Sequence, residues 1–255
     1  MTDSQDKRAI YPSLRGKRVL ITGGGSGIGA GLVEGFVRQG SDVTFFDIAD
    51  EESKALVTGL GADNLRYERV DLTDVEATQA TIRRLMDEGG AFDVLVNNAG
   101  NDDRHKWEDV TEEYWDRRLD VNLKHQFFCT QAVVPGMKAK GGGAVINFGS
   151  ISWHLGLPEL TVYQTAKAAI EGLTRALARE LGPDGIRVTC VVPGNIRTPR
   201  QLKWYTPEAE AALVASQCLQ GRLAPEDVAA LVLFLASDDA RLITGHEYWV
   251  DAGWR

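Results

Sequence analysis

Tyr163 and Lys167 are the pair of side chains in this sequence whose types and spacing best suit acid–base chemistry. They stand four residues apart in a stretch of helical periodicity, which puts them on one helix face, one turn apart. A tyrosine titrates near ~10 in water, and a neighbouring ammonium stabilises its phenolate. Ser150, 13 residues upstream, supplies a hydroxyl that could hold a substrate oxygen against Tyr163. The set predicts removal of a proton from an alcohol, and the alternative is an ordinary helix pair without chemistry.

A glycine-rich turn, Thr22–Gly29, follows the first apolar run and opens an apolar helix. Glycines allow a tight turn and let the backbone approach a pyrophosphate at the positive end of a helix. The spacing is TGxxxGxG, which departs from the GxGxxG of the general dinucleotide fingerprint. A flexible or close-packed loop is the alternative, but the position between a strand and a helix favours cofactor binding.

Asp47 ends the second apolar run, about 20 residues beyond the glycines, where a ribose-binding carboxylate is expected. A carboxylate accepts hydrogen bonds from both ribose hydroxyls and repels a 2′-phosphate. No Arg or Lys occupies positions 48–53 to attract that phosphate. Asp47 therefore predicts NAD rather than NADP; a helix cap or an exposed loop acid is the alternative.

Further motifs complete a set that the chain shares with a known family. Asn97–Gly100 (NNAG) follows the fourth run, Tyr163–Lys167 (YQTAK) opens a helix, and Pro193-Gly194 follows the sixth run. With the glycine turn and Ser150, in this order, the sequence resembles the short-chain dehydrogenase/reductase family from about residue 14 to 255. The resemblance implies a nicotinamide-dependent oxidoreductase with Ser150, Tyr163, Lys167 and Asn122 as its catalytic residues.

The same resemblance assigns Asn122 to a water and proton relay that reaches the lysine, although an Asn inside a helix can also simply bend it. It implies that Lys167, which also holds the nicotinamide ribose, lowers the pKa of Tyr163 together with the oxidised nicotinamide. The residues expected to bind NAD are Gly23, Ser26, Gly27, Ile28, Gly29, Asp47, Asp71, Leu72, Asn98, Ala99, Gly100, Tyr163, Lys167, Pro193, Gly194, Ile196 and Thr198. Asp71 could equally cap the helix that follows Thr73.

The segments in which members of this family differ carry polar and flat aromatic side chains here. That combination suits a carbohydrate, because hydroxyls need hydrogen bonds while C–H faces stack on rings. AGNDDRHK, INFGSISWHLG and TGHEYWVDAGWR resemble the aldose dehydrogenases of the family. This implies oxidation of the anomeric carbon of a pentose, D-xylose first, with L-arabinose or a related aldose possible, to the aldonolactone. Expected sugar contacts are Asn101, Ser150, Trp153, His154, Tyr163, Gln164, Asn195 and Trp204.

Two other functions compete with sugar oxidation. A carbonyl reductase of the 3-oxoacyl-thioester type should prefer NADPH and present a basic surface to an acidic carrier, and Asp47 and the net charge of −8 count against it. A non-catalytic NAD-binding regulator would typically have lost one of the catalytic residues, all of which are present.

The elements that must position these residues alternate between short apolar runs and amphipathic stretches. Strands are expected over Arg18–Thr22, Asp42–Asp47, Arg66–Val70, Asp93–Asn97, Ala144–Phe148, Arg187–Val192 and His246–Val250. Helices are expected over Gly27–Gln39, Val75–Asp87, Glu112–Lys138, Val162–Leu181 and Pro225–Ala236, among others. The alternation predicts an α/β fold: a single Rossmann-like doubly wound domain over 1–255, with about seven parallel strands and helices on both faces. A TIM barrel competes, and the glycine turn decides against it. Residues 1–13 are expected to be a flexible extension, and 195–220 a substrate lid.

The amino-acid composition argues against several classes of binding partner and indicates the cellular compartment. Lys+Arg 28 against Asp+Glu 36 disfavours nucleic acid. Three cysteines without CxxC spacing disfavour a disulfide scaffold or a thiolate zinc site, and no metal is expected. No apolar run approaches the ~20 residues that span a bilayer, and the N-terminus carries no signal-peptide pattern. We expect a cytoplasmic protein without membrane contact and, from the family resemblance, a homotetramer, in which Trp254 packs on a neighbouring subunit or within its own chain.

Overall fold

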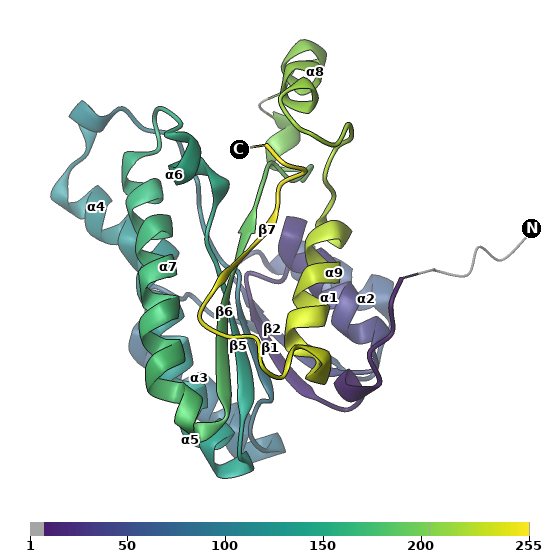
Figure 1. Ribbon diagram of the computed structural model, residues 1–255. Helices are drawn as coiled ribbons and strands as arrows, with labels where there is room; N and C mark the ends of the chain where they lie inside the picture. The colour runs from purple at the N-terminus through teal and green to yellow at the C-terminus, as the bar shows by residue number, and fades with distance from the viewer. Residues whose placement is uncertain (1–7, 204, 255) are drawn as a thin grey trace, which may run out of the picture.

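A seven-stranded, all-parallel sheet forms the centre of the described part of the chain, residues 8–203 and 205–254 of the computed structural model (Figure 1). Its order is β3-β2-β1-β4-β5-β6-β7, so the chain reverses direction across the sheet between β1 and β4. The strands are β1 Arg18–Thr22, β2 Asp42–Asp47, β3 Leu65–Arg69, β4 Val94–Asn97, β5 Gly143–Phe148, β6 Ile186–Pro193 and β7 Glu247–Val250. The expected doubly wound fold is confirmed, with each expected strand found within one residue of its bounds.

Helices cover both faces of the sheet (Figure 1). They are α1 Gly27–Arg38, α2 Asp50–Leu60, α3 Val75–Gly89, α4 Glu112–Leu119, α5 His125–Lys140, α6 Ile151–Leu155, α7 Thr161–Leu181, α8 Pro207–Ala215 and α9 Pro225–Ala236. α1, α2 and α9 lie on one face, α3, α5 and α7 on the other, and α8 stands beyond one end of the sheet. No helix among residues 8–203 and 205–254 is long and apolar enough to cross a membrane.

Successive side chains of the central strands point to opposite faces of the sheet, and each face has its own hydrophobic core. On β1, Val19 and Ile21 pack with Phe36 of α1 and Val232 of α9, while Leu20 faces the α3, α5 and α7 layer. Because both faces are buried, such strands must be apolar at nearly every position, which explains why they were recognisable as short unbroken runs. In this topology ligands bind at the carboxyl ends of the strands beside the reversal point, here between β1 and β4.

One expected helix has a different backbone. The stretch Glu112–Lys138 was predicted as one regular helix, but α4 and α5 are separated by a π-helical segment, Asp120–Lys124. The Asn122 side chain inside it donates to the carbonyl of Arg118 one turn earlier, at 3.0 Å, and also bonds a distant loop. These contacts fit the wide turn of a π-helix, and they cannot be predicted from the hydrophobic periodicity of the sequence.

The described part of the N-terminal stretch, which was predicted as a flexible extension over 1–13, makes contacts with the body of the protein. The Tyr11 amide donates to Gln39 Oε1 at 2.7 Å, and Gln39 Nε2 donates to the Ala9 carbonyl at 3.0 Å. A 3₁₀ turn, Pro12–Leu14, then buries Leu14 in the α1–α9 core. Residues 1–7 lie outside the described residues.

Phe36 tests the core that holds α1, and with it the glycine turn, on the sheet. Its side chain is fully buried, so Phe36→Ala should lower the free energy of unfolding by about 3–5 kcal/mol through lost burial and a cavity. Urea unfolding followed by circular dichroism measures this as a lower midpoint at unchanged slope. The control is Leu242→Ala, at a side chain that is 82% exposed, with a loss below about 1 kcal/mol. Equal losses in the two variants would contradict this packing.

Candidate active site

Ser150, Tyr163 and Lys167 meet at the carboxyl edge of the sheet. Ser150 follows β5 and caps α6, accepting a hydrogen bond from the Ser152 amide at 3.2 Å, while Tyr163 and Lys167 project from the first turns of α7. Ser150 is a hydrogen-bond partner of the Tyr163 phenol, and Lys167 Nζ lies 5.5 Å from the centre of the Tyr163 ring. The structure therefore brings together the three groups that the spacing predicted.

Lys167 is an ammonium held in a buried position. Its side chain is 2% exposed, and Nζ donates to the carbonyl of Phe148, the last residue of β5, at 2.8 Å. Burial lowers the pKa of Lys167 to about 8, against a partly opposing effect of nearby negative charge that includes Asp102. The lysine is thus set so that its charge changes close to neutral pH.

Burial shifts the pKa of Tyr163 in the opposite direction to that of Lys167. Burial raises the pKa of its phenol above the usual range, and the Asp102 carboxylate raises it further, whereas the Ser150 hydrogen bond and the Arg200 charge lower it. Burial therefore outweighs any help that Lys167 gives in the protein by itself. Positive charge from elsewhere is needed before the phenolate forms near neutral pH.

Asn122 fixes the loop that follows β4. Its Oδ1 accepts from the Asn101 amide at 2.8 Å, and its Nδ2 donates to the Asn101 carbonyl at 3.0 Å. The residue lies beside Lys167, because a Cβ placed on Gly100 would be 3.2 Å from Asn122 Oδ1 and 3.4 Å from Lys167 Nζ. Its side chain thus joins the π-helical segment to the site.

The glycine turn is packed too tightly for other residues. A Cβ on Gly29 would lie 1.8 Å from the Gly23 carbonyl oxygen, and one on Gly25 would lie 2.4 Å from Ser53 Oγ. The first turn of α1 contains no acidic residue, and Ser26, at its N-cap, makes no side-chain cap. The turn is thus a close-packed cradle at the start of a helix, which fits the pyrophosphate of a dinucleotide.

Asp47 lies against this turn. Its Oδ2 accepts from the Gly25 amide at 2.8 Å, and Oδ1 accepts from the amides of Ile48 and Ala49 at 2.8 and 3.0 Å. Since α2 is entered through Ala49, Asp47 is not the cap of that helix. A carboxylate at this place fits the ribose hydroxyls of a dinucleotide whose pyrophosphate lies on the glycine turn.

The other expected cofactor positions surround the same edge. Asn98 Nδ2 donates to the carbonyls of Thr22 and Gly23 at 3.0 and 2.9 Å, which ties the end of β4 to the glycine turn. Asp71 accepts from the Thr73 amide and does not cap α3, because Asp74 does so. Four further positions also line or adjoin this edge, namely Leu72, Ala99, Pro193 and Gly194.

The segment after β6 returns over the glycines. Ile196 is buried and pairs with Leu223, and the next buried residue is Thr198. A Cβ placed on Gly27 would lie 3.2 Å from the methyl of Thr198. The beginning of the expected lid therefore touches the turn expected to hold the pyrophosphate.

The expected sugar contacts have partners within the protein. The indole nitrogen of Trp153 and Nε2 of His154 both lie 2.9 Å from Glu171 Oε1, so each would meet a sugar through its ring rather than that nitrogen. Gln164 Nε2 donates to the Leu157 carbonyl at 2.6 Å, and the amide of Asn195 bonds Tyr205 and Arg222. Trp204 lies outside the described residues.

Sequence reasoning missed the charged residues at the mouth of the site. Arg200 pairs with both Asp102 and Asp103, which are almost a hundred positions away in the sequence. All three stand in segments that were recognised as variable, but only the fold shows that these segments meet. No group of three or more His, Cys, Asp or Glu in the described part of the chain could hold a metal ion.

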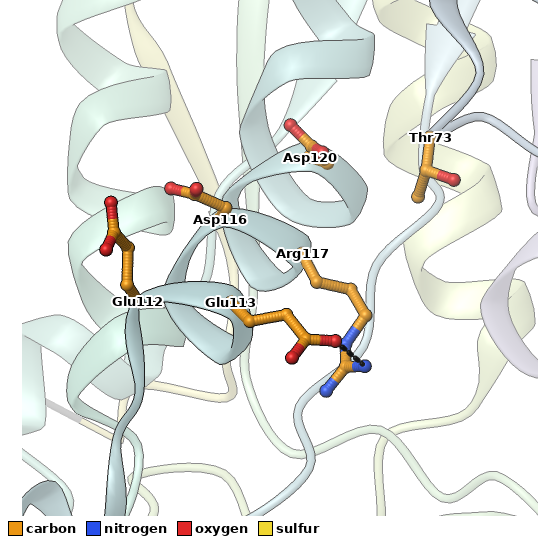
Figure 2. A pocket seen from close by; sticks show the side chains of 6 residues that line it. All are labelled: Thr73, Glu112, Glu113, Asp116, Arg117 and Asp120. Atoms are coloured by element: carbon orange, nitrogen blue, oxygen red, sulfur yellow. Dashed lines mark ion pairs between the residues drawn. The ribbon is translucent and has the colours of Figure 1, made fainter.

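A hollow on the α4 side is separate from this site (Figure 2). It is lined by Thr73, Glu112, Glu113, Asp116, Arg117 and Asp120, and an ion pair at 3.6 Å joins Arg117 to Glu113 across the lining. With four carboxylates against one guanidinium, the lining repels anions and is a poor place for phosphate groups.

Comparison with known proteins identifies the family. The family model described as "Enoyl-(Acyl carrier protein) reductase" matches residues 23–255. The chain is 70% identical to "D-xylose 1-dehydrogenase" of Caulobacter vibrioides over 249 residues, which is 97% of this chain and 99% of that protein. It belongs to the short-chain dehydrogenase/reductase family.

Two further similarities lie within this family. A protein of Rhizobium meliloti named "Probable galactose dehydrogenase GalD" is 48% identical, with 95% of this chain and 96% of that protein covered. A crystal structure from Sinorhizobium meliloti 1021, assigned to the short-chain alcohol dehydrogenases, superimposes with a TM-score of 0.88 at 32% identity and covers 95% of this chain and 98% of that one. Family membership accounts for the order of the motifs and makes this chain an oxidoreductase that uses a nicotinamide cofactor.

Burial of Lys167 predicts a specific dependence of stability on pH. Its pKa is about 8 when folded against 10.5 as the ordinary value, so between these pH values the unfolded chain binds a proton that the folded protein has lost. Stability therefore rises with pH in this window. The difference in unfolding free energy between wild type and Lys167→Met should be flat below pH 8 and then shift in favour of wild type by up to about 3 kcal/mol at pH 10.5. Denaturant titrations at a series of pH values measure it, and a constant difference up to pH 10.5 would show that the lysine is not depressed.

Proposed function

We propose that this protein is an NAD-dependent aldose 1-dehydrogenase that oxidises the anomeric carbon of a pentose to the aldonolactone. D-Xylose is the first candidate, followed by L-arabinose and related aldoses. The observation that carries the proposal is the 70% identity, over nearly the full length of both chains, to a protein named D-xylose 1-dehydrogenase. The meeting of Ser150, Tyr163 and Lys167 at the carboxyl edge of the sheet supports it with the groups that alcohol oxidation needs.

The chain's own residues divide the work as follows. The Ser150 hydroxyl donates a hydrogen bond to the anomeric oxygen and holds it against Tyr163, whose phenolate oxygen takes the C1 hydroxyl proton. Lys167, fixed on the Phe148 carbonyl, stabilises that phenolate and binds the nicotinamide ribose. Asn122 keeps the Asn101 backbone in place. NAD, when bound, supplies the oxidised nicotinamide that accepts the hydride.

NAD is proposed over NADP because of the charge around the expected ribose position. Asp47 is fixed there by three backbone amides, so its carboxylate cannot easily turn away from a 2′-phosphate. Arg69, the nearest strand-end cation, is paired with Asp50 at 3.2 Å. A 2′-phosphate would therefore meet the fixed negative charge of Asp47.

We also propose that the enzyme works in the cytoplasm as a homotetramer, as the family resemblance implies. Trp107, Trp115 and Phe127 are exposed large apolar side chains on or beside α4 and α5. They offer apolar surface of the kind that subunit contacts cover.

The first test is a set of initial rates. With NAD, D-xylose or L-arabinose should give the highest kcat/KM among D-xylose, L-arabinose, D-galactose, D-glucose and L-fucose, and NADP should be at least about tenfold poorer, because a tenfold loss needs only ~1.4 kcal/mol of repulsion. Formation of NADH at 340 nm measures the rates. If no sugar reacts and NADPH instead reduces a 3-oxoacyl thioester, the reductase alternative replaces this function. If NAD binds and neither reaction proceeds, the chain is a regulator.

Tyr163 is the proton acceptor in the proposed mechanism. Tyr163→Phe removes only the phenolic oxygen, so kcat should fall by at least about a thousandfold, near the upper part of what a positioned base contributes, while NAD affinity stays within about threefold. Rapid-mixing rates and calorimetric NAD titration measure the two. The matched control is Tyr248→Phe, on β7 away from the site, which should keep wild-type rates. Turnover near the wild-type level in Tyr163→Phe would rule out this proton acceptor.

A further inference from the structure

Arg200 connects the lid to the loop after β4. It stands just before the 3₁₀ turn Gln201–Lys203. Its Nε donates to Asp102 Oδ1 at 2.8 Å, and its Nη2 donates to Asn101 Oδ1 at 3.1 Å and also to Asp103 Oδ1. The neighbouring Gln201 donates through Nε2 to Asp102 Oδ2 at 3.0 Å. A single exposed ion pair stabilises little, but here several bonds from two adjacent residues meet on three consecutive acceptors.

Both ends of this connection are held by the body of the protein. On the loop side, Arg118 of α4 donates to Asp103 Oδ2 at 2.8 Å, and Asn122 holds the backbone of Asn101. On the lid side, buried Thr198 sits against the glycine turn at Gly27. The bonded lid segment therefore reaches from Thr198, which lies against the expected cofactor turn, to the loop that Asn122 holds.

The same residues act on Tyr163 through their charge. Ser150 after β5, Asp102 on the loop after β4 and Arg200 on the lid all affect the pKa of this phenol, and Lys167 Nζ on α7 lies 5.5 Å from the centre of its ring. Asp102 raises the pKa of Tyr163 and Arg200 lowers it, so the two charges offset each other when the lid is bonded. If the lid swings away, Arg200 leaves and Asp102 remains, since Asp102 belongs to the loop.

We propose that Arg200 is a positioning residue that latches the lid onto Asp102 and Asp103 and thereby cancels the negative charge that Asp102 presents to Tyr163. Closure of the lid and activation of the base are then one event. An open site leaves Tyr163 beside an uncompensated carboxylate, which holds the phenol in its protonated, inactive form. A closed site neutralises that carboxylate, so proton removal proceeds only when the mouth is covered.

Hydrogen–deuterium exchange of the full-length protein tests the latch without any substrate. In Arg200→Met, amides of residues 196–203 should exchange at least about threefold faster than in wild type, because the bonds to the loop are lost. The matched control is Lys203→Met, which removes a positive charge from the same turn at an exposed side chain and should exchange like wild type. Unchanged exchange in Arg200→Met would overturn the proposal.

The pH dependence of kcat tests the effect on charge. Arg200→Met should move the rising limb of the oxidation rate to higher pH by roughly half a unit to one unit, and Asp102→Asn should move it to lower pH by a similar amount. The double variant should lie near wild type. A purely structural role would lower kcat in both single variants at every pH without moving either profile, and that result would overturn the proposal.

This second readout rests on the proposed aldose oxidation, whereas the exchange measurement does not. If wild type oxidises no aldose, the proposed function fails and the exchange rates alone decide the latch. If wild type oxidises an aldose and the two variants shift in the same direction, the function stands and the latch fails.

Discussion

A buried ammonium on a strand-end carbonyl is the interaction around which the catalytic side of this molecule is arranged. Lys167 Nζ has the Phe148 carbonyl as its hydrogen-bond acceptor, and that carbonyl is available only because β5 ends there. Removing a charge from water is costly unless its protons are bonded, so the position of α7 relative to β5 is tightly constrained. The same constraint fixes the positions of two neighbouring residues. Ser150 stands two residues after Phe148, and Tyr163 stands one turn before Lys167.

The cofactor side depends on a second constraint, which is steric rather than electrostatic. The glycine turn and the segment after β4 approach so closely that a Cβ added at Gly23 or Gly29 would collide with Ala99 or Asn98. Asn98 bridges the turn and β4 with two hydrogen bonds, so the crevice beside the reversal point of the sheet is a rigid feature. The segment after β6 is attached there through buried Ile196, which belongs to the core on the α1–α9 face, and through the polar bonds of Arg200 and Gln201 to the loop after β4.

The sequence predicted most of this frame for a physical reason. Parallel strands buried on both faces must be apolar at nearly every position, so β1 to β7 stood out, and the glycines marked the turn between β1 and α1. The π-helical segment at Asn122 was missed because hydrophobic periodicity does not report hydrogen bonds such as the one from Asn122 to Asn101, 21 positions away. The hydrogen bond from the Tyr11 amide to the Gln39 side chain was missed for the same reason, since such bonds over long sequence distances leave no periodic signal.

The site was predicted as a set of residue types rather than as an electrostatic environment. Motif spacing identified Ser150, Tyr163 and Lys167, but the direction in which burial moves the pKa of Tyr163 requires the surrounding atoms. Asp102 and Arg200 carry opposite charges on segments that only the folded chain brings together. The order of motifs in a sequence therefore does not predict which charged residues will pair at the edge of the sheet.

Glu171 has a consequence for anyone who wishes to alter sugar preference. One oxygen of this largely buried carboxylate lies 2.9 Å from both the indole of Trp153 and the imidazole of His154, whose rings also lie against each other. Replacing either ring strips a partner from a carboxylate that water reaches poorly, and the remaining ring loses its support. Trp153 and His154 should therefore be varied together with Glu171, and not one position at a time.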